Sequence, residues 1–146
     1  MAQFITIPVK NYEIIEHTAD IGIRVYAPDI AGLFKNAGLA ISQLSAEKIN
    51  HQEKQQKKIS ISLEADNLEE LFLDWLNELI SLSAAKGLIF EDFAINKISE
   101  THIEAAVAAA DIKSYKVNTE IKAATYHELK VQQINGSWQA EVIFDV

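Results

Sequence analysis

The sequence contains no cysteine, which excludes disulfide bonds, thiolate nucleophiles, cysteine-ligated zinc and iron–sulfur clusters. Any bound metal would therefore use oxygen or imidazole ligands. Proline and glycine are scarce, at two and five of 146 residues, so the composition lacks a collagen-like, linker or disordered bias. With 49% apolar residues, a chain of this length supports a single hydrophobic core. We expect one domain over residues 1–146.

Basic residues are outnumbered, because 13 Lys and Arg against 21 Asp and Glu give a net charge of −8 at pH 7. A protein that binds nucleic acid directly normally carries positive charge, so direct nucleic-acid binding is disfavoured. No apolar run approaches the roughly 18 residues that span a bilayer, and the N-terminus lacks a charged leader followed by a long apolar stretch. These features predict a soluble, cytoplasmic protein without a membrane partner.

Hydrophobic periodicity predicts two amphipathic helices. One covers residues 30–44 after an N-cap at Asp29. The second begins after Asp66 or Asn67, with acidic residues at capping-box spacing, and ends near Gly87. Its stripe of Leu, Phe, Trp and Ile side chains favours a buried face.

Alternation of apolar and polar residues predicts strands over most of the remaining chain. The turn Asn135-Gly136 is typical of a two-residue hairpin, because a type I′ turn needs positive φ twice. The expected strands lie within residues 12–27, as two strands flanking 17–20, and over 59–65, 88–98, 103–109, 121–134 and 137–146. Without regular βαβ alternation, the order favours an α+β fold, a mainly antiparallel sheet packed with two helices in two layers.

Two places in the sequence could carry chemistry. His17 and Asp20 lie three residues apart in a short connection between strands. At the other end of the sequence, Asp145 is followed by Val146 and its α-carboxylate, and two adjacent anionic groups could bind a hard cation through oxygen. The structural alternatives are a turn in which Asp20 binds nearby backbone amides, and a terminus that is simply hydrated.

Common catalytic signatures are missing. The histidines form no H-x-x-x-H pair, and neither a glycine-rich phosphate loop nor a G-x-S-x-G elbow is present. The second helix carries a polar side that is either a solvated face or an acidic docking surface for a basic partner. This side consists of Glu70, Asp74, Asn77, Glu78 and Ser81.

Four motifs taken together resemble the archease family, from near Tyr12 to the end of the chain. The sequence departs from the family at residues 108–111, Ala-Ala-Ala-Asp, where archeases commonly have a Gly-Glu pair, and it lacks a His often seen before the third motif. The motifs are His17-Thr18-Ala19-Asp20-Ile21-Gly22, Asp74-Trp75-Leu76-Asn77-Glu78-Leu79, Glu120-Ile121-Lys122-Ala123-Ala124-Thr125-Tyr126-His127 and Asp145-Val146.

The resemblance implies an archease-like fold and a non-catalytic partner of the RtcB-type RNA ligase, which acts in tRNA splicing and RNA repair. Archeases promote guanylylation of that ligase and permit its multiple turnover. The family's metal site would fall on Asp20, Asp145 and the terminal carboxylate of Val146, with a divalent cation of the Ca²⁺ or Mg²⁺ type. His17 and Lys122 would be accessory residues, and Lys122 should share a face with residues 124 and 126 if its strand is regular.

Two other functions compete with this one. A small metal-dependent hydrolase could use Asp20, Asp145 and His17 to activate water, although only Lys122 or His127 could then serve as a further catalytic group. A chaperone-like binding module would bind many clients and would be indifferent to replacement of Asp20.

Overall fold

The computed structural model describes residues 3–6, 12–16, 20–49 and 56–146. Its elements alternate between strands and two long helices. In chain order they are β1 (Gln3–Thr6), β2 (Tyr12–Glu16), β3 (Asp20–Ala27), α1 (Ile30–Ser45), β4 (Ala46–Lys48), β5 (Lys57–Glu64), α2 (Leu68–Lys86), β6 (Leu88–Ile98), β7 (His102–Asp111), the 3₁₀ helix η1 (Ile112–Ser114), β8 (Tyr115–Val117), β9 (Ala123–Ile134) and β10 (Ser137–Asp145).

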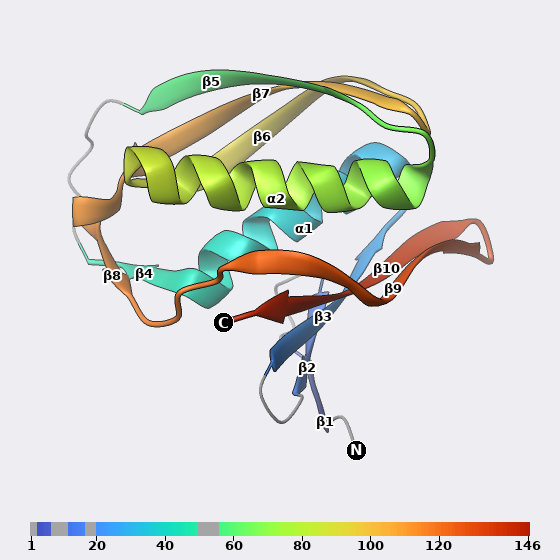
Figure 1. The fold of residues 1–146 in the computed structure, drawn as a ribbon, viewed down its shortest axis with the longest axis horizontal. Coiled ribbons are helices and arrows are strands. Elements are labelled where there is room, and N and C mark those ends of the chain that lie inside the picture. Colours follow the sequence, from blue (N-terminus) through green and yellow to red (C-terminus); the bar gives the residue numbers. More distant parts are fainter. Residues whose placement is uncertain (1–2, 7–11, 17–19, 50–55) are drawn as a thin grey trace.

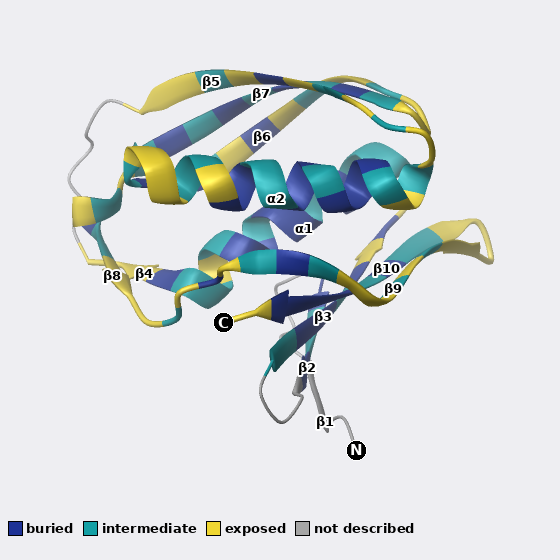
Figure 2. Cartoon of the chain, in the orientation of Figure 1, coloured by how far each residue is buried: buried dark blue, intermediate teal, exposed yellow. Residues whose placement is uncertain are grey.

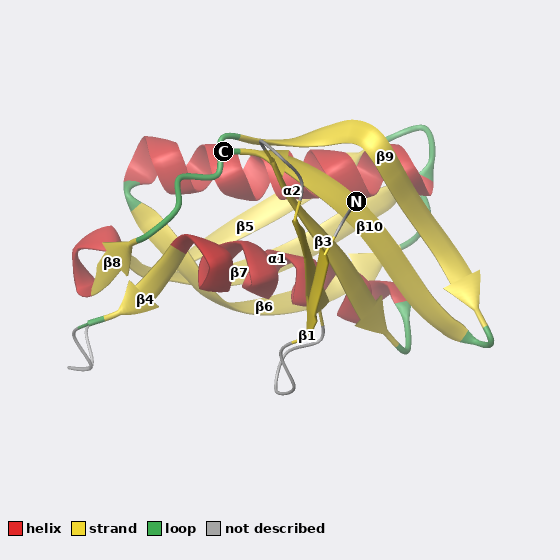
Figure 3. Ribbon diagram, turned by 90° about the horizontal axis from the view of Figure 1, so that it is seen from below, coloured by secondary structure: helices red, strands yellow, loops and turns green. Residues whose placement is uncertain are grey.

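The two helices lie side by side between two antiparallel sheets (Figures 1 and 3). One sheet has five strands in the order β1-β2-β3-β10-β9, and the other has three in the order β5-β7-β6. A two-stranded pair, β4-β8, lies near the C-terminal ends of the helices. The α+β class with mainly antiparallel sheet and two packed helices is confirmed, and a second sheet on the far side of the helices extends the expected two layers.

Both helices begin where their capping residues predicted. The side chain of Asp29 accepts a hydrogen bond from the Gly32 amide at 2.7 Å. Asn67, one of the two expected caps of α2, accepts from the Glu70 amide at 2.9 Å. Gly87 ends α2 in the left-handed conformation, with φ of 63°. No helix in the described part of the chain has the length and hydrophobicity needed to cross a membrane.

The core is centred on aromatic side chains of the helices. Trp75 is fully buried, and its indole N–H donates to the carbonyl oxygen of Phe34 at 3.0 Å. The ring of Phe34 packs edge-on against Phe72, and that of Trp75 against Phe93 of the three-stranded sheet. Figure 2 shows the buried residues gathered on the faces of the helices and sheets that meet. The helices therefore fix both sheets through one core.

Strand β10 positions the candidate site, because its side chains alternate as predicted. Ala140, Val142 and Phe144 are buried toward the helices, whereas Glu141 and Asp145 lie on the outer face of the five-stranded sheet.

Three features differ from the expected strands. The short strands β1, β4 and β8 have too few residues to produce an alternation pattern. Strand β9 begins at Ala123 rather than at residue 121, because Ile121 turns into the core before the ladder starts. The register of β9 on β10 also breaks, so that residues 126–129 lie opposite Val142 alone.

Candidate metal centre on the five-stranded sheet

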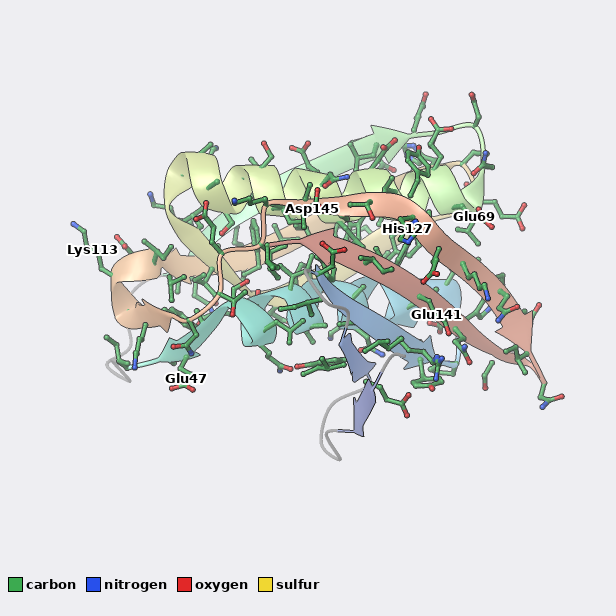
Figure 4. The ribbon with its side chains drawn as sticks, turned by 60° about the horizontal axis from the view of Figure 1, so that its bottom comes forward. Glu47, Glu69, Lys113, His127, Glu141 and Asp145 are labelled. Carbon is green, nitrogen blue, oxygen red and sulfur yellow. The ribbon has the colours of Figure 1, made fainter. Side chains whose placement is uncertain are left out.

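The sheet brings Asp20 and Asp145 together, although they are far apart in the sequence. Asp20 begins β3, Asp145 ends β10, and the two residues lie directly opposite each other in the antiparallel register. Figure 4 views the molecule toward this outer side and shows Asp145 at the C-terminal end of β10.

Hydrogen bonding along β10 shows whether Asp20 and Asp145 form a hydrogen-bonded or a non-hydrogen-bonded pair of the antiparallel ladder. The carbonyl oxygen of Asp145 accepts a hydrogen bond from the Lys122 amide at 2.9 Å, so the main chain of Asp145 points toward β9 and away from β3. Asp20 and Asp145 are therefore a non-hydrogen-bonded pair, in which Cα atoms are about 4.5 Å apart and side chains are closest. The two side chains therefore lie next to each other on one face of the sheet.

No cation of the protein neutralises this pair in the part of the chain that the structure describes. Ion pairs form elsewhere on the same sheet, but none of those between described residues involves Asp20 or Asp145. Like charges directly opposite on adjacent strands destabilise the sheet. Two carboxylates are also the oxygen donors that Ca²⁺ and Mg²⁺ prefer, so the pair fits a hard cation.

The remaining predicted ligands contribute less to the described geometry. Val146 follows Asp145 at the end of β10 and is 40% exposed. His17 lies outside the described residues. Among described side chains, no three His, Asp or Glu residues form a group that could hold a metal. A site here would therefore combine the two aspartates with a main-chain carboxylate.

Lys122 immediately precedes β9 and contacts the site through its main chain. Its side chain is exposed and forms no ion pair with a described residue. The expected common face with Ala124 and Tyr126 requires a regular strand. That condition is not met, because β9 starts after Lys122 and its pairing with β10 breaks after Thr125. An accessory role for Lys122 remains a prediction.

Asn77 of α2 holds β9 in place, a role that the sequence did not reveal. Its side-chain amide donates to the carbonyl oxygen of Ala124 at 3.1 Å, and its side-chain oxygen accepts from the Ala124 amide at 2.8 Å. Asn77 thus satisfies the N–H and the C=O of Ala124. Ala124 follows Ala123, which lies opposite Asp145. The motif around Asn77 was recognised, but nothing in its spacing identified the partner strand. The polar side of α2 is accordingly half-buried at Asn77 rather than fully solvated.

A second charged group on the same outer face was also missed. Arg24 of β3 lies opposite Glu141 of β10 and Glu13 of β2. Its guanidinium is 2.7 Å from the Glu141 carboxylate and 3.4 Å from the Glu13 carboxylate. Burial lowers the pKa of Arg24, but hydrogen bonding and the charge of Glu141 outweigh this effect and raise it above its ordinary value. The sequence signal for this cluster is one basic and two acidic residues on three strands, but it can be recognised only when the register of those strands is known.

Another carboxylate, that of Glu91, is held by donors within the protein. It accepts hydrogen bonds from the Tyr115 hydroxyl, from Lys48 at 3.0 Å and from Gln56 at 2.7 Å. Burial raises the pKa of Glu91, but these three donors outweigh burial and hold it below its ordinary value. Burial, followed by hydrogen bonding to Glu91, raises the pKa of Tyr115. This cluster ties β4 and β8 to β6.

Comparison with known proteins identifies relatives over nearly the whole chain. The Archease protein family (MTH1598/TM1083) matches residues 12–146. The protein archease of Methanosarcina barkeri is 34% identical, with 94% of this chain and 97% of the relative covered. The protein archease of Pyrococcus abyssi is 31% identical, with 94% and 100% covered.

Solved structures show the same fold. The solution structure of Methanobacterium thermoautotrophicum protein 1598 matches with a TM-score of 0.73 and 25% identity, over 93% of this chain and 99% of that protein. The crystal structure of an archease from Thermotoga maritima, described as a possible chaperone, matches with a TM-score of 0.64 and 24% identity, over 90% and 94%. Sequence and fold agree, and the chain belongs to the archease family.

Proposed function

We propose that this archease is a non-catalytic activator of an RtcB-type RNA ligase in tRNA splicing and RNA repair. It promotes guanylylation of the ligase and multiple turnover through a divalent cation held by Asp20, Asp145 and the α-carboxylate of Val146. The observation that carries the proposal is the placement of Asp20 directly opposite Asp145, without a neutralising cation among the described residues. Family membership supports the choice of partner.

The residues of the chain have separate tasks in this proposal. Asp20 and Asp145 provide oxygen ligands from adjacent strands, and a Ca²⁺ or Mg²⁺ ion bound there would supply a localised positive charge. Asn77 holds the start of β9 against α2, and the Lys122 amide holds it against the end of β10, which limits movement of Asp145. Lys122 and His17 are proposed as accessory residues that orient the aspartates or contact the ligase.

The charge of the protein favours a protein partner over RNA. A net charge of −8 repels phosphate groups and attracts a basic surface, such as the surroundings of an active site that binds RNA. In this proposal the archease contacts the ligase and makes no direct contact with nucleic acid. A cytoplasmic location would be consistent with that partner.

A multiple-turnover ligation assay tests the proposal. A limiting amount of RtcB-type ligase is incubated with labelled RNA ends, GTP and Mn²⁺ or Mg²⁺, with and without this protein. We expect more product per ligase with the wild-type chain and no stimulation with Asp20→Ala. Asp66→Asn, which removes one charge from an exposed residue at the start of α2, is the matched control and should stimulate fully.

Two results would contradict the proposal. Full stimulation by Asp20→Ala would remove the metal site from the mechanism. Metal-dependent cleavage of the RNA by this protein alone, lost in Asp145→Ala, would instead establish the hydrolase function. Folding of each variant is checked by its circular dichroism spectrum.

A further inference from the structure

Strand β9 forms one edge of the five-stranded sheet (Figure 3). On the edge of β9 that faces away from β10, the hydrogen bonds that described residues make to the main chain come from Asn77 and are made to Ala124. Further along β9, near the hairpin, the edge has no comparable cover from described residues. An uncovered sheet edge presents main-chain donors and acceptors that can pair with another strand.

The two-residue hairpin defines which main-chain groups face outward. Ile134 and Ser137 flank the turn and form its closing pair, so their main chains face each other. By alternation, Gln132 also faces β10, whereas the N–H and C=O groups of Val131 and Gln133 point away from the sheet. No described residue forms a hydrogen bond with these outward groups. The edge therefore offers two donors and two acceptors in the spacing of a β-ladder.

A groove of about 560 Å³ lies between this edge and the first turn of α2. Leu68, Val131 and Trp138 contribute apolar side chains to its lining. Two acidic side chains also line it, Glu69 from α2 and Glu100 from the β6–β7 connection, and both residues are exposed. Figure 4 shows Glu69 at the start of α2. The groove combines apolar surface with negative charge next to an open strand edge.

We infer that the edge of β9 at Val131 and Gln133 binds an extended, lysine- or arginine-bearing segment of a protein partner as an additional strand. Main-chain hydrogen bonds would supply affinity, and the groove would select apolar side chains alternating with basic ones. Glu69 and Glu100 favour a basic occupant. They also disfavour a second copy of this chain, because edge-to-edge pairing would bring two acidic grooves together.

This site is separate from the Asp20–Asp145 pair and does not depend on the proposed ligase. Asp145 lies at the opposite end of β10 from the hairpin that closes the groove. Asp20→Ala is therefore expected to leave binding at the groove unchanged. The two proposals can fail independently.

Fluorescence anisotropy with a labelled ten-residue peptide of alternating Lys and Val tests the charge requirement. We expect saturable binding to the wild-type chain, and affinity about tenfold weaker for the Glu69→Gln and Glu100→Gln double variant. Glu47→Gln, an exposed residue on β4, controls for a general loss of negative charge. Equal binding of a peptide with Glu in place of Lys would overturn the proposal.

Val131→Pro tests the strand pairing itself. Its N–H points away from β10, so proline should preserve the ladder and the urea midpoint while lowering peptide affinity about tenfold. If this variant does not fold, a peptide N-methylated at alternate residues makes the same test on the wild-type chain. Unchanged affinity in either case would overturn the proposal. A concentration-dependent dimer that excludes the peptide would show that a second copy is the occupant instead.

Discussion

Two pairs of residues on the outer face of the five-stranded sheet have the same geometry but opposite electrostatics. Arg24 lies opposite Glu141 and Asp20 lies opposite Asp145, both on β3 and β10. Arg24 contacts carboxylates on both neighbouring strands, whereas the two aspartates have no ion-pair partner among described residues. Among the described residues, the sheet supplies a cation at the first pair and none at the second. The external cation that we propose would occupy the second pair.

The charges of the two pairs also interact only weakly with each other. Glu141 and Asp145 are four residues apart, or about 13 Å along a strand, which exceeds the Debye length of about 8 Å at physiological salt. Ile143 lies between Glu141 and Asp145 on this face and is opposite Gly22 of β3. The space at Gly22 is tight, because a Cβ added there would lie 3.1 Å from the carbonyl oxygen of Ile15. The positive charge of Arg24 is therefore not available to the aspartates.

Removing the internal cation should have the largest effect. Arg24→Ala removes the guanidinium that contacts Glu13 and Glu141, the carboxylates on the two strands that flank β3. Breaking a fully buried pair costs 3–5 kcal/mol, and because the Arg24 side chain is 23% exposed we expect a loss of about 2–3 kcal/mol. Urea unfolding followed by circular dichroism measures the change.

A surface ion pair provides the control for Arg24. Lys35 and Asp92 are 3.7 Å apart, with side chains 45% and 72% exposed. Lys35→Ala should therefore change the free energy of unfolding by less than about 1 kcal/mol. If the two variants lose the same stability, the outer-face cluster is no stronger than an exposed pair and the contrast with the aspartates disappears.

The next effect concerns Glu91, whose charged form is stabilised by hydrogen bonds. Tyr115→Phe removes the hydroxyl that donates to Glu91 and should lower the free energy of unfolding by about 1.5 kcal/mol at pH 7. Because the pKa of Glu91 is lowered on folding, its contribution is complete above the ordinary carboxyl pKa of about 4.3 and is lost as pH falls through the lower folded value.

Urea unfolding between pH 7 and pH 2 distinguishes this effect from a simple packing change. The stability difference between wild type and Tyr115→Phe should shrink as acid protonates Glu91. At the alkaline end, the raised pKa of Tyr115 means that its contribution persists to about pH 10 and decreases as pH rises through the folded value. A difference independent of pH would show that Tyr115 acts through its ring alone.

The sequence predicted the regular elements well because local signals define them. The caps at Asp29, Asn67 and Gly87 and the turn at residues 135–136 depend on side chains within a few residues of the main-chain groups they affect. Strand order and the division of strands between two sheets depend on contacts between distant segments. Alternation specifies a buried face but does not identify which strand lies beside it.

The candidate site shows the same limit. The family resemblance implies that Asp20 and Asp145 belong to one site, whereas the residues alone present them as two separate places that could carry chemistry. Only the register of β3 on β10 makes the two aspartates direct neighbours. The contacts of Arg24 and Asn77 were missed because both join strands or helices that are distant in the sequence. The long-range pairing of strands therefore has to be known before polar residues in the sequence can be assigned to one site.

Moving the third proposed ligand should weaken cation binding. Extending the chain beyond Val146 by three Gly residues displaces the α-carboxylate from Asp145 and leaves both aspartates in place. We expect about a tenfold loss of Ca²⁺ or Mg²⁺ affinity, because one charged oxygen ligand is removed. Calorimetric titration of the two chains measures it. Equal affinity would remove Val146 from the site while leaving the two aspartates as candidates.

The smallest effect distinguishes a cation site from a structural turn at Asp20. In EDTA, Asp20→Asn removes repulsion with Asp145 and should raise the free energy of unfolding by about 0.2–1 kcal/mol. With excess Ca²⁺ the order should reverse, because the ion stabilises the folded wild-type chain by binding it. Asp66→Asn, an exposed residue outside the sheet, should show neither change. If Asp20→Asn lowers stability equally in EDTA and in Ca²⁺, the carboxylate serves as a hydrogen-bond acceptor for nearby backbone amides, and the contrast with Arg24 is structural rather than functional.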